Sequence, residues 1–142
     1  MKHAPEAALK ARLATLAGIP KAWPNQDFDL PPVPGDAAAR YAWAYLACEI
    51  IRTGTSDTTL NAEAPVVTGR LIATAVTLKG TGEARANEIA EQVAALFPMG
   101  ERIAVSGFVT QITQPPHIRE GMGDGAYWRV PVSIPFQTFT SP

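Results

Sequence analysis

Near its carboxyl end the chain reads Tyr127-Trp128-Arg129-Val130-Pro131-Val132-Ser133-Ile134-Pro135-Phe136. Every even-numbered position of this segment is apolar, and a period of two with one apolar face is the pattern of a half-buried β-strand. Pro131 and Pro135 both remove a hydrogen-bond donor from the same edge of that strand. We therefore expect a strand that lies at a sheet boundary, or that pairs poorly along one side. The pattern favours a small sheet domain that meets other copies of itself.

The composition is that of one domain of ordinary size. A chain of 142 residues can bury a core without disulfides or metals. Twelve basic and 13 acidic residues give a net charge of −1, so no global positive field favours nucleic acid. The single cysteine indicates a reducing compartment. The chain shows neither an apolar secretory signal nor a membrane-spanning run, so we expect a soluble intracellular protein without membrane contact.

Helical and strand periodicities alternate along the rest of the chain. The expected helices cover residues 5–16 and 83–97, and the expected strands cover 41–52, 66–78, 103–113 and 127–136. A helical turn capped by Asp36 is possible just before the first strand. This order predicts one α+β domain over residues 1–142, in which two helices pack on one antiparallel or mixed sheet of about four to five strands. Long polar loops are expected at 53–65 and 114–126, and loops of this length in compact domains are usually functional or disordered.

One glycine-rich turn could bind an anion. Gly80-Thr81-Gly82 connects a predicted strand to a predicted helix, whose N-terminus attracts negative charge. The turn lacks the third glycine of a dinucleotide fingerprint and the Gly-Lys-Ser/Thr of a P-loop. A plain turn into a helix is therefore favoured, and a small anion- or nucleotide-binding domain that uses Gly80–Gly82 remains an alternative.

The sequence shows no group of residues with the spacing of a catalytic or metal-binding motif. His3, Cys48 and His117 lack the spacing of a zinc site. Cys48 lies in an apolar run, which favours a buried and inert thiol over a nucleophile. We predict no catalytic residue, no cofactor and no metal, and hence a protein that is not an enzyme.

Some side chains are better suited to an interface than to the core. Trp23, Phe28 and Phe139 lie near connections or the chain end, where core residues are less expected. Glu49 alternates onto an aromatic face, where a carboxylate needs a partner. That partner is either Arg70 or Arg129 across the sheet, or a group on another subunit. Basic residues are not interleaved with aromatic ones, so no specific nucleic-acid platform is expected.

Several segments together resemble the phage tail terminator proteins, which cap the tail tube of long-tailed bacteriophages. They are Ala22-Trp23-Pro24-Asn25, the Gly80-Thr81-Gly82 helix that ends in Leu96-Phe97-Pro98, and the Trp128–Phe136 strand. The resemblance extends over nearly the whole chain. It implies a ring-forming, hexameric subunit at the head-proximal end of the virion tail, which ends tube polymerisation and offers a surface for head attachment.

The resemblance also implies partners, namely further copies of the chain, the tail-tube protein and a head–tail connector or neck protein. Charged residues on tube-facing loops of the family would correspond to Asp57, Glu63, Arg119, Glu120 and Asp124. The full interface hypothesis comprises Trp23, Phe28, Glu49, Asp57, Glu63, Arg119, Glu120, Asp124, Arg129 and Phe139. A neck or other minor tail component of the same fold would look alike, and the source could be a phage, a prophage or a gene transfer agent.

Overall fold

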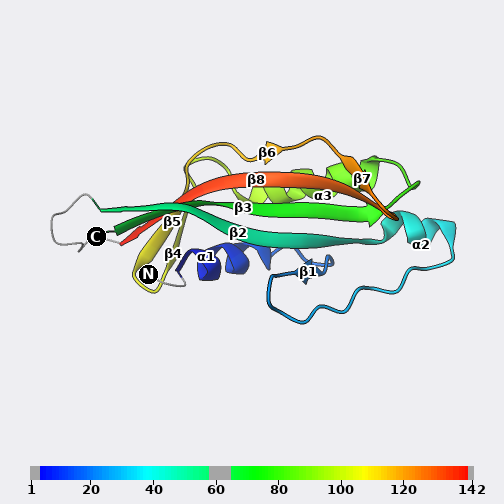
Figure 1. The fold of residues 1–142 in the computed structure, drawn as a ribbon, viewed down its shortest axis with the longest axis horizontal. Coiled ribbons are helices and arrows are strands. Elements are labelled where there is room, and N and C mark those ends of the chain that lie inside the picture. Colours follow the sequence, from blue (N-terminus) through cyan, green and yellow to red (C-terminus); the bar gives the residue numbers. More distant parts are fainter. Residues whose placement is uncertain (1–3, 58–64, 141–142) are drawn as a thin grey trace.

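The computed structural model describes residues 4–57 and 65–140, which form three helices and one sheet of eight strands (Figure 1). The helices are α1 (Ala4–Leu13), α2 (Ala37–Ala42) and α3 (Ala84–Leu96). The strands are β1 (Lys21–Ala22), β2 (Ala44–Asp57), β3 (Pro65–Leu78), β4 (Arg102–Val105), β5 (Phe108–Ile112), β6 (His117–Ile118), β7 (Met122–Asp124) and β8 (Tyr127–Thr140). The α+β class is confirmed, but the sheet has more strands than the four to five expected, and α2 adds a third helix.

Three long antiparallel strands form the frame of the sheet. The order is β1-β2-β3-β8-β5-β4, and β6 and β7 pair with β8 beside this path. Ala73 in the middle of β3 lies between Cys48 of β2 and Val132 of β8. The pairing of β1 with β2 is parallel, so the sheet is mixed, which is one of the two sheet types that the sequence predicted.

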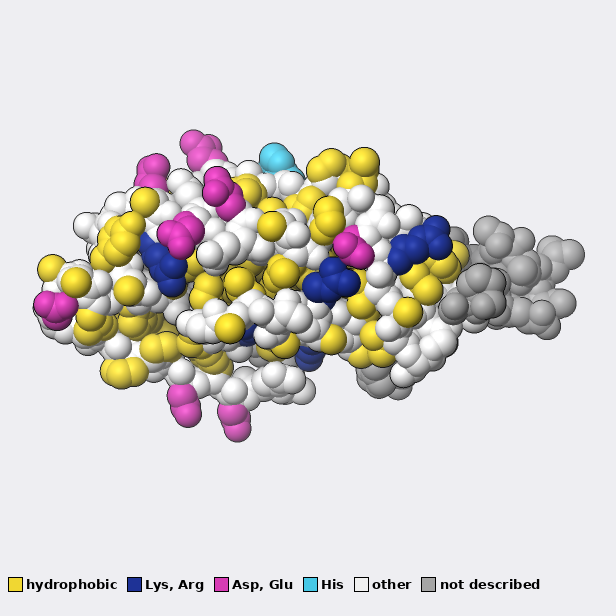
Figure 2. Space-filling model, turned by 180° about the vertical axis from the view of Figure 1, so that it is seen from behind, with side chains coloured by type: hydrophobic (Ala, Val, Ile, Leu, Met, Phe, Trp, Pro, Cys, Tyr) yellow, Lys and Arg dark blue, Asp and Glu magenta, His cyan; other side chains and the backbone are white. Residues whose placement is uncertain are grey.

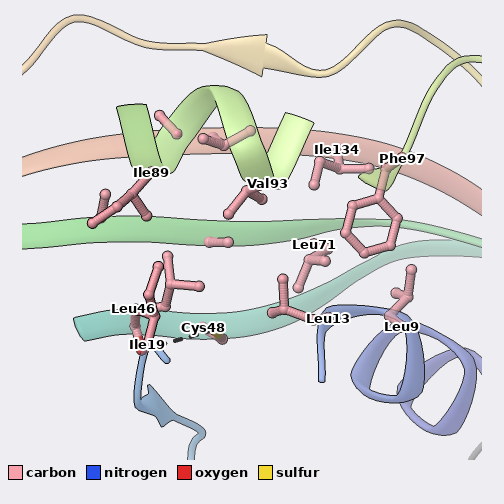
Figure 3. Close-up of a cluster of buried hydrophobic side chains, with 14 of the residues drawn as sticks. Leu9, Leu13, Ile19, Leu46, Cys48, Leu71, Ile89, Val93, Phe97 and Ile134 are labelled. Carbon is pink, nitrogen blue, oxygen red and sulfur yellow. Dashed lines mark hydrogen bonds between the residues drawn. The ribbon is translucent and has the colours of Figure 1, made fainter. Parts of the chain in front are cut away.

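Both long helices cover the same face of this sheet. Figure 3 shows Leu9 and Leu13 of α1 and Val93 of α3 turned toward the strands, among other buried side chains of one core cluster. Leu71 of β3 and Ile134 of β8 meet them from the sheet, and all five are fully buried. Burial of side chains of this size stabilises a fold by roughly 1.5–3 kcal/mol each.

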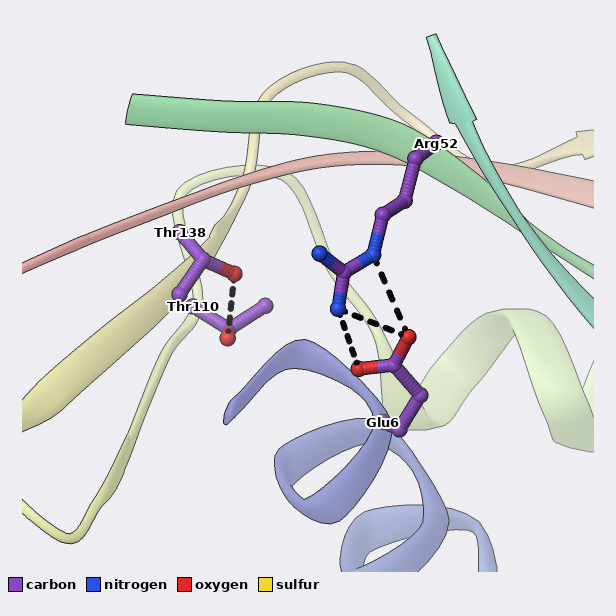
Figure 4. Close-up of polar contacts among 4 residues, drawn as sticks. All are labelled: Glu6, Arg52, Thr110 and Thr138. Atoms are coloured by element: carbon purple, nitrogen blue, oxygen red, sulfur yellow. Dashed lines mark hydrogen bonds and ion pairs between the residues drawn. The ribbon is translucent and has the colours of Figure 1, made fainter. Parts of the chain in front are cut away.

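Polar contacts add to this packing at the margins of the core. The carboxylate of Glu6 in α1 accepts hydrogen bonds at 3.0 Å from the guanidinium of Arg52 in β2 (Figure 4). Thr110 and Thr138 are buried and share a hydroxyl hydrogen bond of 2.8 Å, so each satisfies the other. The first contact connects helix to sheet, and the second connects β5 to β8.

The terminal strand β8 is central, and its predicted position at a sheet boundary is wrong. The carbonyls of Pro131 and Pro135 accept from the backbone N–H groups of Arg119 (2.8 Å) and Thr113 (3.1 Å), so both prolines face away from β3. Because N–H and C=O of one residue point to the same edge, the ladder with β3 keeps all its donors. On the edge of β8 that carries the prolines, the pairing partner is not one strand but three short ones, β5, β6 and β7. Pro135 lies between the segments paired with β5 and β6, and Pro131 lies between those paired with β6 and β7. The alternative prediction, poor pairing along one side, is confirmed.

Two predicted strands have different bounds. Residues 41–52 do not form one strand, because α2 continues to Ala42 and is capped by Asp36, whose side chain accepts from the N–H of Ala39 at 3.1 Å. Residues 103–113 are a hairpin, since Ser106 and Gly107 turn the chain with φ of 53° and 82°. Short-range turn chemistry overrides strand periodicity in both places.

The two predicted loops are also largely corrected. β2 extends to Asp57 and β3 begins at Pro65, so residues 53–57 are strand, and residues 58–64 lie outside the described part. Threonines favour this extended conformation, and a bulge at Thr53 between Arg52 and Gly54 accommodates the extra residue. Residues 114–126 contain β6 and β7 and run along the side of β8.

Candidate interaction surfaces

The sheet presents a second face on the side opposite α1 and α3, here called the outer face. Strand alternation places on it the neighbours of the buried core residues. Its members are Ala47, Glu49 and Ile51 of β2, Arg70, Ile72 and Thr74 of β3, and Arg129, Pro131, Ser133 and Pro135 of β8. Glu49 and Arg70 are exposed, and Ile51 is 43% exposed. This face is therefore available for contacts beyond the subunit.

One end of the outer face is covered by aromatic side chains. The rings of Trp43 and Tyr127 stack with centroids 5.8 Å apart, and Phe28 lies 5.2 Å from Tyr45. The indole N–H of Trp43 donates to the carbonyl of Pro31 at 3.1 Å. These contacts hold residues 23–36, here called the strap, against the sheet. Phe28, predicted at an interface, is thus already engaged within its own chain.

The other two aromatic interface candidates each lie near a basic side chain. The ammonium of Lys10 lies 5.0 Å from the ring centroid of Trp23, at the start of the strap. The guanidinium of Arg102 lies 5.9 Å from the ring of Phe139, near the far end of β8. Both rings are half-buried. Trp23 thus belongs to the same segment as Phe28, whereas Phe139 lies at the other end of the sheet.

Glu49 does not form the predicted ion pair across the sheet. Arg129 instead pairs with Asp124 of β7, with Nε and Oδ2 2.7 Å apart. Within the described residues no ion pair joins Glu49 to Arg70 or to Arg129. Glu49, Trp23 and Arg129 do border one cavity of about 340 Å³ on the outer face. Three members of the interface hypothesis therefore meet here, and a subunit contact remains as the prediction for Glu49.

The charged loop candidates are divided between the two ends of the sheet. Arg119 and Glu120 are exposed in the connection between β6 and β7. Asp57 is the last residue of β2 and pairs in register with Pro65. Glu63 lies outside the described residues. Arg119 and Glu120 could therefore act with Asp124, but not with Asp57, in a single contact.

One hollow on the outer face was not predicted as a site from the sequence. A cavity of about 420 Å³ is lined by Arg70, His117 and Arg119, together with the buried side chain of Ser133. The sequence had suggested Arg70 only as a partner for Glu49. Its proximity to His117 follows from the pairing of β6 with β8, which a two-residue strand without periodicity does not reveal.

The Gly80–Gly82 segment is a turn into α3, as favoured. Both glycines have positive φ, 89° and 91°, which side chains rarely adopt. The turn borders a cavity of about 350 Å³ together with Lys79, Glu83 and Trp128. Glu83 occupies the N-cap position of α3 without a capping hydrogen bond from its side chain, and it contributes an acidic group to the lining of this cavity. This arrangement argues against the anion-binding alternative.

Cys48 has the environment of a core residue. Burial raises the pKa of its thiol to about 12, and the nearby charge of Lys21 only partly opposes this. Burial in turn lowers the pKa of Lys21. A thiol of this kind is protonated near neutral pH and is a poor nucleophile. The prediction of a buried, inert cysteine is thereby supported.

The described residues contain neither a metal-binding cluster nor a membrane-spanning helix. No group of three or more His, Cys, Asp or Glu side chains in residues 4–57 and 65–140 could hold a metal ion. Among the helices of the same residues, none is both long enough and apolar enough to cross a membrane.

The described residues form a single α+β unit. Helices cover one face of its sheet, and charged side chains line hollows on the other, accessible face, as in a protein that binds partners through its surface. The profile of the phage tail terminator protein family matches residues 6–136. The chain therefore belongs to the phage tail terminator family, a family of structural proteins of the phage tail, as the sequence resemblance predicted.

Solved structures support the fold independently. One of them superposes with a TM-score of 0.77 at 23% sequence identity, over 100% of this chain and 98% of its own. At this identity the likeness concerns the fold alone. No curated protein matches the sequence significantly.

Proposed function

We propose that this protein caps the tail tube as a ring of identical subunits, six in the form that the family resemblance implies. The ring ends polymerisation of the tube and offers the head-proximal surface to which a neck or connector protein binds. The protein acts by assembly in the virion tail, after synthesis in the host cytoplasm, and not by chemical turnover. The observation that carries the proposal is the family match over residues 6–136.

The accessible outer face supports an assembly role. A ring subunit needs two different contact surfaces for its two neighbours, because a ring is built from head-to-tail contacts. The chain has an edge at β1 and β2 with the strap, and a different flank at β6 and β7. The interface candidates Glu49, Arg119, Glu120, Asp124 and Arg129 lie on or beside the outer face between these two flanks.

The proposal is tested by the mass of the assembled protein. Light scattering would be measured on the purified protein alone and after mixing with the tail-tube protein of the same gene cluster, with the tube protein alone as control. We expect either a hexamer, or a monomer that becomes a ring on tube ends. A protein that stays monomeric at high concentration and does not associate with tubes would contradict the proposal.

The same mixture separates a neck component from a terminator. A terminator stops tube growth in the absence of any head protein, because its ring occupies the growing end. A neck component of the same fold would leave tube growth unchanged and would bind only after a terminator is present.

A further inference from the structure

The eight arginines of the chain differ in what their side chains contact. Six have a partner within the described residues: Arg12, Arg40, Arg52, Arg85, Arg102 and Arg129. Arg70 and Arg119 have no hydrogen bond, ion pair or ring contact from their side chains in that same part of the structure. Both of these arginines line the cavity of about 420 Å³ on the outer face. The two unpartnered guanidinium groups are therefore in one place.

The fold positions both arginines from separate elements. Arg70 belongs to β3 and is paired in register with Pro135 of β8. Arg119 follows β6, where its backbone N–H donates to the carbonyl of Pro131 at 2.8 Å. His117 pairs with Ser133 between them. Arg70 is thus held within a strand, and Arg119 is held in the β6–β7 connection by a backbone hydrogen bond to β8.

The chemistry of this cavity suits a carboxylate. Besides the two arginines it offers Gln114, His117 and Ser133 as donors, its other lining residues are prolines, and no acidic residue lines it. Arg119 also borders a neighbouring hollow with Glu83 and Glu120, but forms no ion pair with either. Unpaired guanidinium groups bind carboxylates or phosphates through paired hydrogen bonds.

Nucleic acid is the less suitable source of that anion. Figure 2 shows acidic and basic side chains dispersed over the face that it views, without a broad basic patch, and the net charge of the chain is −1. Nucleic-acid binding relies on many basic side chains along the phosphate backbone. A recess with two arginines fits a single acidic segment better.

The strap of the same chain provides such a segment. Asp27 and Asp29 are exposed and have no hydrogen bond or ion pair within the described residues. Figure 1 shows the strap, between β1 and α2, along one border of the molecule and β6 along the opposite border. A contact between these two borders cannot form within one subunit, but it can form between successive subunits.

We propose that the cavity at Arg70 and Arg119 receives the strap carboxylates Asp27 and Asp29 of the next copy of this chain. Such a contact joins two different surfaces, so it propagates from subunit to subunit and closes into a ring when the rotation permits. The inference rests on the proposed ring, and it names the groups that connect one subunit to the next.

A charge exchange tests this contact. The variants are R70E/R119E, D27R/D29R and the fourfold combination, and R85E/R102E serves as a control with an equal change in net charge. Circular dichroism would verify that each variant folds, and ring formation would be scored by sedimentation velocity and by electron microscopy of tube ends. We expect each contact double variant to weaken ring formation at least about tenfold, because a buried charge then faces a like charge. The fourfold variant should form rings again, and the control R85E/R102E should form rings as the wild type does.

Each other outcome overturns the inference. Wild-type rings that persist in R70E/R119E, or a fourfold variant that stays defective while folded, would show that these residues do not meet. Rings that form in R70E/R119E but no longer bind tubes would assign the cavity to the tube protein. A wild type that forms no ring, alone or on tubes, would overturn the proposed function as well, and the two failures are thereby distinguishable.

Discussion

The two faces of the β2–β3–β8 sheet differ in burial and in charge, although successive residues of the same strands contribute to them alternately. Leu71 and Ile134 are fully buried beneath α1 and α3, whereas their neighbour Arg70 on the outer face is exposed. The helix-covered face provides the stability of the subunit. The outer face keeps charged side chains, of which Glu49 and Arg70 have no partner in the described residues. The same strands are thus buried by helices on one side and leave charged side chains accessible on the other.

The largest expected effect comes from the covered face. Phe97→Ala should lower the free energy of unfolding by roughly 3–5 kcal/mol, because the ring is fully buried in the core. Ile51→Ala on the outer face is the matched control, and it should cost about 0.5 kcal/mol or less. Urea denaturation of both variants measures the difference. Equal losses would contradict the assignment of stability to one face.

A second substitution tests the close approach of β2 and β3 at the bulge. A Cβ atom on Gly69 would lie 2.4 Å from the carbonyl oxygen of Ile51 and 3.0 Å from Cζ of Phe136. Gly69→Ala should therefore destabilise the fold by about 1–3 kcal/mol, since the backbone must shift. Gly35→Ala in the strap meets nothing within 4 Å and should be close to neutral. Urea denaturation measures both losses, and a neutral Gly69→Ala would show that the strands are not held this closely.

A smaller effect is expected at the ion pair between α1 and β2. Glu6→Gln removes the charge opposite Arg52, in a contact whose two side chains are about one-third exposed. Surface pairs of this kind contribute about 0.2–1 kcal/mol. The loss should shrink in 1 M salt, because mobile ions screen exposed charges. A loss that is large and independent of salt would mean that the carboxylate does more than pair with Arg52.

The smallest effect on the free energy of unfolding at neutral pH is expected from the ionisation of Cys48. The folded state raises the pKa of this thiol from 9.0 to about 12, so folding favours the protonated form. This contribution is complete below pH 9.0 and is lost as the pH rises toward about 12. Lys21 acts with the opposite sign, because its lowered pKa makes its contribution to stability rise with pH.

The comparison with Cys48→Ala isolates the thiol. Chemical denaturation at several pH values should show parallel stabilities of both proteins up to pH 9, and a steeper fall of the wild type above it. Parallel behaviour over the whole alkaline range would mean that the thiol ionises as freely in the folded protein as in the unfolded one.

Much of the covered face could be predicted from the sequence, and less of the outer face. The period-two pattern of residues 128–136 identified the buried side of β8, and the helical period identified α3, because both patterns reflect burial. The central position of β8 could not be predicted, since two prolines suggested an edge. They are tolerated because the neighbouring strand is interrupted at each of them.

The candidate site depended on long-range pairing. Strand alternation points to Glu49, and the family resemblance points to Arg119. Glu49 and Arg129 lie on the outer face and Arg119 lies at its border, and an interface role for these residues stays a prediction. The association of Arg70 with Arg119 was missed, since it depends on the register of β3, β8 and the short β6. Local patterns carry no information about which strands become neighbours.

The central claim is that copies of this chain form a ring that ends growth of the tail tube. The most direct measurement is electron microscopy of tubes grown from the tail-tube protein with and without this protein, with tube length and the symmetry of tube ends as readouts. We expect tubes that stop growing and that carry a ring of subunits at one end. Tubes that keep their length distribution and show bare ends at saturating protein concentration would contradict it.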